Sequence, residues 1–138
     1  MDRYDLQRFV DAQRAVYAQV ERELKVGRKE SHWMWYVFPQ LAGLGHSAMA
    51  QKFALSSLAE AKAFLNHAML GPRLRHCTGL VTGVVGRSIE DIFGFPDDLQ
   101  FHSSMTLFAH AAKENRVFMD ALAKYYRAEF DSRTVARL

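Results

Sequence analysis

The sequence predicts an all-α protein: a single compact multi-helix domain over residues 1–138 with a buried aromatic segment. Apolar residues recur at steps of three, four and seven through most of the chain, which is the spacing of amphipathic helices. The helical stretches are joined by short connections that carry glycine, proline or capping residues. Outside the aromatic segment no stretch has the pattern of a clear strand, so a strand formed by that segment would have no partner strand.

The composition is that of a globular protein. The chain has 138 residues, which suits one domain, and a chain of this length buries roughly 68% of the surface that its unfolded form exposes. Hydrophobic residues make 49% of the chain and charged residues 24%, a balance that disordered chains do not have. The net charge of +3 is spread over short groups and forms no continuous stripe, so nucleic-acid binding is not expected.

Cysteine usage and hydropathy favour a cytoplasmic protein. Cys77 is the single cysteine, which excludes an internal disulfide and fits a reducing compartment. No apolar run approaches the roughly 18 residues of a membrane span, so no membrane association is expected. The first residues, Met1–Asp5, lack the charged and then apolar pattern of a signal peptide.

The first predicted element is one amphipathic helix from Asp5 to Gly27. Its apolar stripe consists of Leu6, Phe9, Val10, Val16, Tyr17, Val20 and Leu24. Asp2 or Asp5 can cap its start, and Gly27 has the position of a C-terminal stop. Gln13 and Arg14 lie between the apolar turns and can point either way.

An aromatic segment follows, from Ser31 to Gln40. It holds both tryptophans, Trp33 and Trp35, and its pattern does not separate helix from strand, because either conformation would be apolar on all faces. In both cases the segment is expected to be buried. Pro39 disfavours helical geometry at the residue before it. We therefore predict a short helix or an irregular buried segment.

The rest of the chain is predicted to form further helices, each with a capping or breaking residue at its start. These residues are Ser47, Ser57, Pro72, Ser88, Asp97 or Asp98, Asn115 and Asp131. Ser57 and Glu60 are expected to form a capping box, in which the hydroxyl and the carboxylate each satisfy a free amide. Gly86 is expected to end the helix that starts at Pro72.

The turn Gly43–Ser47 leads into one of these short helices. Free amides at a helix start can hold a phosphate or a carboxylate, although the turn has neither the Walker pattern nor the glycine pattern of dinucleotide-binding proteins. Two interpretations stay open: a plain turn, or an anion site. Tryptophans able to stack a base or a nicotinamide precede the turn, and Gln51 and Lys52 follow it.

Metal and nucleophile patterns are absent from the sequence. The six histidines are His32, His46, His67, His76, His102 and His110. No two of them are three or four residues apart, so no metal site is predicted. His102 and Ser103 are neighbours that point in different directions on a helix, so they do not form a nucleophile and its base. No catalytic residue is assigned.

Four stretches resemble an uncharacterised, mostly bacterial family, domain of unknown function 1810. They are Leu6–Gln13, His32–Leu41 with the following Gly43-Leu44-Gly45 and Ser47, Leu70–Leu74, and Ser103–Phe108. Because the resemblance extends over essentially the whole chain, the sequence is identified as a member. It implies a compact all-helical fold and no established activity; some members are labelled calpastatin, but this chain has no feature of a protease inhibitor. Many relatives have a lysine at the position of Gln100, so no cationic role is carried over there.

A shorter stretch is similar to the NADAR family, which acts on ADP-ribose conjugates. His46 and Gln51-Lys52-Phe53 match part of that family's motif. The acidic residue of the motif, the expected general acid or base, falls on Gly45. The similarity implies an ADP-ribose-like ligand at the glycine turn.

Two functional hypotheses result. In the first, the protein binds a nucleotide or an ADP-ribose-like small molecule: tryptophans stack its ring, amides of the turn hold its phosphate and Lys52 supplies charge. The candidate residues are His32, Trp33, Trp35, Gln40, Gly45, Ser47, Lys52 and His102. No cofactor is predicted, and whether the ligand is turned over stays open, because no carboxylate pair stands out. In the second hypothesis the protein is a non-enzymatic structural or interaction protein, and the aromatic segment is its core.

Overall fold

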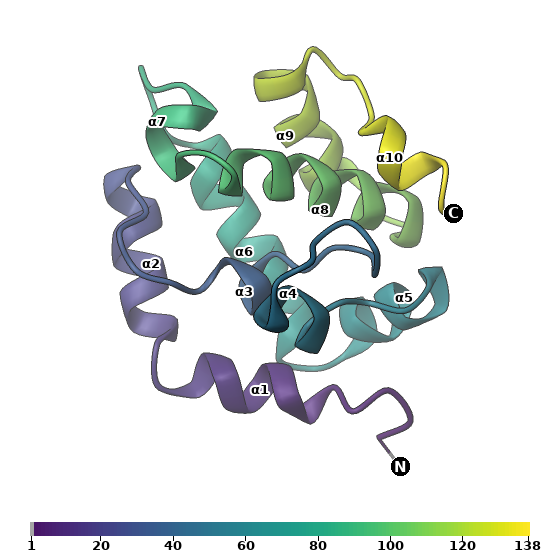
Figure 1. The fold of residues 1–138 in the computed structure, drawn as a ribbon. Helices are drawn as coiled ribbons and strands as arrows, with labels where there is room; N and C mark the ends of the chain where they lie inside the picture. The colour runs from purple at the N-terminus through teal and green to yellow at the C-terminus, as the bar shows by residue number, and fades with distance from the viewer. Residues whose placement is uncertain (1) are drawn as a thin grey trace.

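The computed structural model describes residues 2–138, and the described chain folds into helices with short connections (Figure 1). The helices are α1 (Gln7–Arg14), α2 (Tyr17–Val26), α3 (Met34–Val37), α4 (Ala48–Lys52), α5 (Leu58–Asn66), α6 (Leu70–Thr82), α7 (Ile89–Phe93), α8 (Asp97–Ala111), α9 (Arg116–Tyr126) and α10 (Ser132–Val135). Between residues 2 and 138 there is no strand beyond an isolated bridge of Leu41 with Leu55. The all-α prediction is confirmed. None of these helices is long and apolar enough to cross a bilayer.

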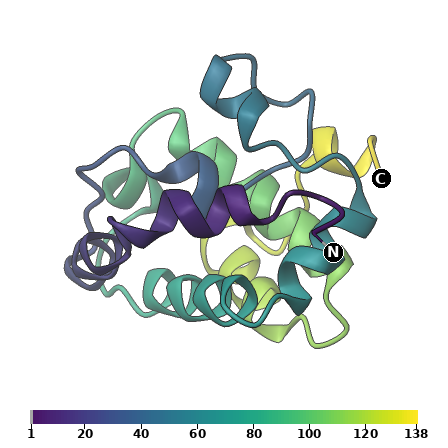
Figure 2. The ribbon, with the colours of Figure 1, turned by 90° about the horizontal axis from the view of Figure 1, so that it is seen from below.

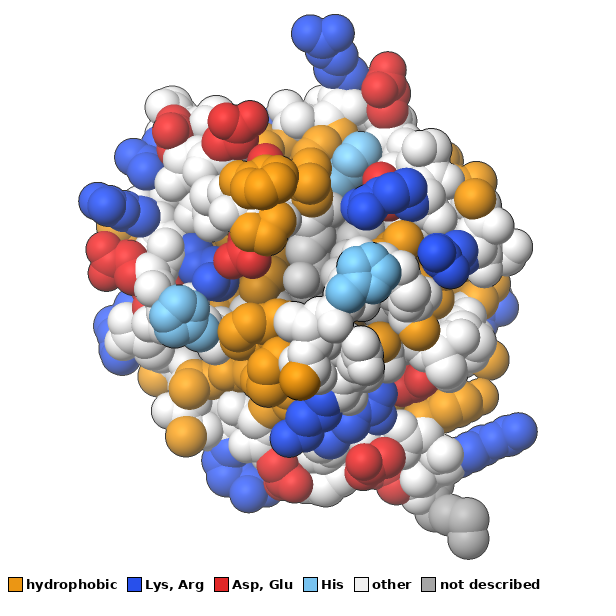
Figure 3. Space-filling model, viewed as in Figure 1, with side chains coloured by type: hydrophobic (Ala, Val, Ile, Leu, Met, Phe, Trp, Pro, Cys, Tyr) orange, Lys and Arg blue, Asp and Glu red, His pale blue; other side chains and the backbone are white. Residues whose placement is uncertain are grey.

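Helix α8 lies at the centre of the fold. It packs against α5, α7, α9 and α10, while α6 packs against α2, α5 and α9 (Figures 1 and 2). Ten of its fifteen residues are buried, which is more than a single apolar stripe. The polar residues Ser103, Ser104 and Thr106 are among them, because small side chains let neighbouring helices approach. On the face drawn in Figure 3, charged side chains of both signs are scattered without a continuous basic stripe.

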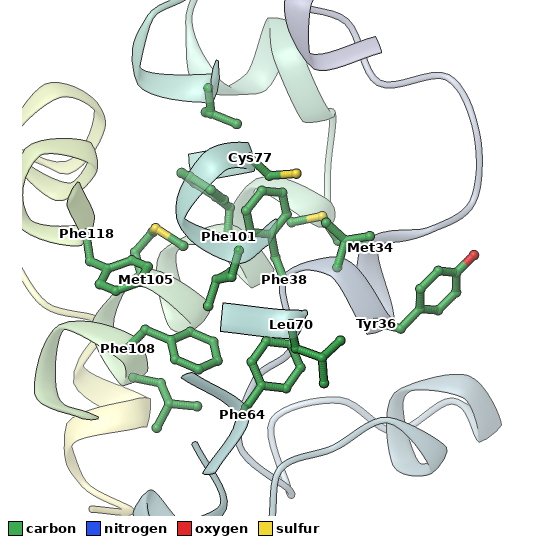
Figure 4. Packing of buried hydrophobic residues seen from close by; sticks show 14 of the residues in the cluster. Met34, Tyr36, Phe38, Phe64, Leu70, Cys77, Phe101, Met105, Phe108 and Phe118 are labelled. Atoms are coloured by element: carbon green, nitrogen blue, oxygen red, sulfur yellow. The ribbon is translucent and has the colours of Figure 1, made fainter. Parts of the chain in front are cut away.

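The aromatic segment is part of the core, as predicted. Its only regular part is the single turn α3, and Phe38, before Pro39, has left helical geometry. The Phe38 ring packs edge-on against Phe101, with ring centroids 5.0 Å apart, and it also contacts Trp33 and Phe93. Figure 4 shows Phe38 and Phe101 side by side in the middle of this core. Through Phe38, the aromatic segment is therefore packed against the centre of α8.

The single helix predicted from Asp5 to Gly27 is wrong. The chain forms two helices, α1 and α2, which turn sharply at Ala15 and Val16; in Figure 2, α2 is seen end-on while α1 lies across the view. The corner is stabilised by Gln13, whose Nε2 donates to the Tyr36 carbonyl at 2.8 Å and whose Oε1 accepts from Arg73 at 3.2 Å. These contacts come from distant parts of the chain, so the local apolar spacing does not reveal the bend.

The predicted capping box at Ser57 is half correct. The Ser57 hydroxyl accepts from the Glu60 amide at 3.1 Å, but the Glu60 carboxylate bonds Ser56 and Arg8 instead of the Ser57 amide. Arg8 comes from α1, so a tertiary ion pair replaces the local contact. The reciprocal capping box is found at the start of α7, between Ser88 and Asp91.

Other predicted helix ends have mixed outcomes. The side chains of Ser47 and Asp131 cap α4 and α10 as expected. Asp97 and Asn115 lie at the starts of α8 and α9 without capping them. Helix α6 ends at Thr82, before the predicted Gly86, and the carbonyls of Thr82 and Val84 accept hydrogen bonds from the Lys124 ammonium of α9 instead of from further helix amides.

Candidate functional site

The segment from Gln40 to Leu55 forms a closed loop. Its two ends are joined by backbone hydrogen bonds, from the Ala42 amide to the Leu55 carbonyl at 2.9 Å and from the Leu55 amide to the Gln40 carbonyl at 3.0 Å. The loop carries the glycine turn and α4, and it crosses in front of α8 in Figure 1. Because its base is pinned, the turn keeps a defined position over the helix.

A hollow of about 390 Å³, here called the Trp35 hollow, lies between this loop, the start of α8 and α10. Its lining residues are Trp35, Gln40, Leu44, Gly45, His46, Ser47, Ala50, Pro96, Asp97, Leu99, Gln100 and Arg133. Its lining combines apolar side chains, among them Trp35, Leu44 and Leu99, with the polar or charged side chains of Gln40, His46 and Arg133.

Four of the eight sequence-predicted residues line this hollow: Trp35, Gln40, Gly45 and Ser47. Trp35 is partly exposed, so its ring offers a ligand a surface that a fully buried ring would not offer. The Ser47 hydroxyl accepts from the Ala50 amide at 3.1 Å and is engaged in capping α4.

The Gln40 amide is held in a fixed orientation. Ser103 Oγ, in α8, donates to Gln40 Oε1 at 2.6 Å, and this leaves Gln40 Nε2 beside the turn at Gly45. Gln100 Nε2 donates to the carbonyls of Met34 and Phe38, at 3.1 and 3.0 Å. Both glutamines therefore tie the aromatic segment to α8, and Gln40 keeps a donor for a ligand.

The lining of the hollow has one carboxylate and one guanidinium group, from Asp97 and Arg133. Asp97 is paired with Lys29, with Oδ2 and Nζ 2.9 Å apart and the lysine side chain only 8% exposed. The Arg133 guanidinium has a longer contact, 3.7 Å from Nε to Asp131 Oδ1, and a half-exposed side chain. Asp97 is thus the more tightly paired of the two, and the half-exposed Arg133 guanidinium is the cationic group that a ligand in the hollow can reach. Sequence reasoning missed Arg133, because nothing in its local pattern links it to the aromatic segment.

The other four predicted residues do not line the hollow. Trp33 is 1% exposed and lies in the core. His32 and Lys52 are exposed elsewhere, the Lys52 ammonium lying 5.3 Å from the centre of the Phe53 ring. His102 stacks on Tyr126 with the rings 3.9 Å apart and nearly parallel, and its Nε2 bonds the Glu129 carbonyl.

A larger hollow of about 600 Å³ lies on another surface, lined by residues of α5, α6 and the end of α8 together with residues 112–114. Its lining has no tryptophan, tyrosine or phenylalanine and none of the predicted residues. Within residues 2–138 no group of three or more His, Cys, Asp or Glu side chains could hold a metal ion. The Trp35 hollow is therefore the candidate site.

This architecture defines a class: an all-helical protein with an aromatic and basic surface hollow. A sequence model of the family described as "Protein of unknown function (DUF1810)" matches residues 3–138, so the chain belongs to this family. The resemblance found in the sequence is confirmed.

One solved structure similar to this chain is the conserved hypothetical protein Rv1873 from Mycobacterium tuberculosis, determined at 1.38 Å. The two chains are 60% identical and superpose with a TM-score of 0.97, over 98% of this chain and 96% of that one. None of the curated proteins matches the sequence.

Proposed function

We propose that the protein binds a nucleotide-like small molecule, with a planar ring and an anionic group, in the Trp35 hollow. One observation carries the proposal: the partly exposed Trp35 ring, the oriented Gln40 amide and the Arg133 guanidinium line the same hollow of about 390 Å³. Such a ligand needs three groups: an aromatic ring on which its own ring can stack, a hydrogen-bond donor that orients it, and a cation that neutralises its anionic group.

Arg133 is a better anion ligand than the amides of the glycine turn. Helix α4 has only five residues, and its first turn is already capped by Ser47. Gly45 is explained by packing, because a Cβ at this position would lie 2.8 Å from the Ala50 Cβ. The anionic group of the ligand is therefore assigned to Arg133 and the neighbouring His46.

The proposal is one of binding and includes no catalytic step. General acid–base chemistry needs a proton donor and an acceptor within reach of the ligand. Asp97 is the one carboxylate in the lining, and its partner Lys29 holds it in an ion pair.

The second hypothesis, a structural or interaction protein, is favoured by one half of the aromatic segment. Trp33, Met34 and Phe38 are each 2% exposed or less, as core residues are. A core role for these residues does not require a ligand, so the two hypotheses differ in whether anything binds beside Trp35.

A thermal-shift screen separates the two. The panel contains nucleoside mono- and diphosphates, NAD and ADP-ribose. A ligand at a hundred times its dissociation constant adds roughly 2.7 kcal/mol and raises the melting temperature by several degrees. Arg133→Ala should remove the shift, whereas Lys52→Ala, which removes an exposed cation outside the hollow, should keep it. A shift that depends on Lys52 and not on Arg133 would place the site elsewhere, and no shift across the panel would favour the structural role.

A further inference from the structure

A second hollow, here called the arginine hollow, adjoins the Trp35 hollow. It has a volume of about 620 Å³ and is lined by Gly43, Leu44, His46, Arg133, Ala136 and Arg137. Three of these residues, Leu44, His46 and Arg133, also line the Trp35 hollow. The two hollows therefore meet along the glycine turn, with Arg133 between them.

The arginine hollow is positively charged. Two guanidinium groups and an imidazole line it, and its lining has no carboxylate. Arg133 is 3.7 Å from Asp131, but the other oxygen of that carboxylate caps Thr134, accepting from its hydroxyl at 2.6 Å. Across residues 2–138, no ion pair or hydrogen bond engages the Arg137 guanidinium. Its charge is thus available to an anion.

The fold positions both arginines. Arg133 lies in α10 and Arg137 in the turn that follows the helix, where the Arg137 amide donates to the carbonyl of the buried Thr134. Both arginines line the same hollow. The Asp131 amide donates to Thr106 Oγ1 at 2.9 Å, which anchors α10 to α8. Gly43 has a φ of +92°, and a Cβ there would be 2.7 Å from Arg137 Nη1. The missing side chain lets the guanidinium lie against the turn.

We propose that the ligand is a nucleoside diphosphate, an assignment that rests on the proposed function. Its base lies on Trp35, its first phosphate contacts Arg133 at the junction, and its terminal phosphate enters the arginine hollow beside Arg137 and His46. Guanidinium groups bind phosphate oxygens through paired, charge-assisted hydrogen bonds. Two adjoining hollows with one arginine at their junction and another beyond it match two linked phosphates, whereas a monophosphate would leave Arg137 unused.

Calorimetric titration tests this with AMP and ADP, GMP and GDP, and UMP and UDP. The proteins are the wild type, Arg137→Ala, Trp35→Ala and Arg116→Ala, the last removing an exposed arginine outside both hollows. At least one diphosphate is expected to bind at least about tenfold more tightly than its monophosphate, because a charge-assisted hydrogen bond contributes this much to affinity. Arg137→Ala should abolish that preference and leave monophosphate affinity unchanged, and Arg116→Ala should preserve it.

The outcomes separate the two proposals. Equal affinity for mono- and diphosphates, with binding lost in Trp35→Ala, overturns the diphosphate assignment and leaves the proposed function standing. A diphosphate preference that survives Arg137→Ala, or is lost equally in Arg116→Ala, also overturns the assignment. If none of the six nucleotides binds to the wild type, the diphosphate assignment fails, and the proposed function fails with it if NAD and ADP-ribose also give no thermal shift.

Discussion

The indole Nε1 of Trp33 donates a hydrogen bond of 3.0 Å to Oε1 of Glu23 in the protein interior. The same carboxylate accepts from the amides of Glu30 and Ser31, from the Ser31 hydroxyl at 2.6 Å and from Gln19 Nε2 at 2.8 Å. Glu23 is 5% exposed, so it replaces water for all these donors at once. One side chain of α2 thereby holds the start of the aromatic segment.

Replacing Glu23 should destabilise the fold strongly. Glu23→Ala leaves the buried Trp33 indole and several partly buried donors without an acceptor. Each unpaired buried group costs about 1–3 kcal/mol and a partly buried one less, so we expect a total loss of about 3 kcal/mol. Urea unfolding followed by circular dichroism measures the loss. The matched control is Glu21→Ala in the same helix, which breaks a partly exposed pair with His76 and should cost less than about 1 kcal/mol. Equal losses in the two variants would contradict the central role of Glu23.

Glu23 should also make the fold acid-sensitive. Burial raises the pKa of this carboxyl, but the hydrogen bonds from Ser31, Glu30 and Gln19 outweigh burial and lower the pKa from 4.5 to about 2. Because the folded pKa lies below the unfolded value, the stabilisation is complete above pH 4.5 and is lost as the pH falls toward 2. The shift corresponds to about 3 kcal/mol. Unfolding free energies of the wild type and Glu23→Gln should converge over this range, and a constant difference would refute the prediction.

The two tryptophans should behave oppositely on mutation. Trp33→Ala creates a cavity in the core and removes a bond to Glu23, so it should cost about 3–5 kcal/mol of stability. Trp35→Ala alters a partly exposed ring and should cost less, while abolishing ligand binding. Melting temperatures and calorimetric titrations of both variants measure the two effects. A Trp35→Ala protein that is as unstable as Trp33→Ala would indicate that both rings serve the core.

Two glycines of α6 should respond to alanine with opposite signs. A Cβ at Gly71 would lie 2.0 Å from the Leu65 carbonyl oxygen, which is backbone and cannot move aside, so Gly71→Ala should cost at least about 2 kcal/mol. Gly79 has open space at its Cβ position, so Gly79→Ala should stabilise by about 0.5–1 kcal/mol. Chemical denaturation of both variants provides the measurement. Stabilisation by both would show that α5 and α6 are less closely packed than described.

The Cys77 thiol should be unreactive in the native protein. It is fully buried, burial raises its pKa to about 11, and its Sγ lies 3.8 Å from the Tyr17 hydroxyl. Near pH 8 only about one thiol in a thousand is then ionised, and the reagent cannot reach it. A thiol-reactive disulfide reagent should label Cys77 quickly in denaturant and very slowly without it. Fast labelling of native protein would contradict the buried position.

Much of the fold could be predicted from residues that are close together in the chain. The helix class and the caps at Ser47 and Asp131 depend on contacts within one or two turns, and both are confirmed. The burial of the aromatic segment could be predicted from its apolar composition, although the partners that cover it come from elsewhere in the chain. The bend after Gln13 could not be predicted in this way, because Tyr36 and Arg73 stabilise it from elsewhere in the chain.

The candidate site shows the same division. Aromatic density and the glycine turn pointed to Trp35, Gln40, Gly45 and Ser47, which share a hollow. Whether Trp33 or Trp35 meets solvent depends on the buried Glu23 carboxylate, which takes the Trp33 indole into the core. Helical periodicity and capping are local properties of a sequence, and so they can be recognised in the chain alone. Arg133 and Trp35 line one hollow because α10 packs against α8, and local spacing has no information about the packing of these two helices.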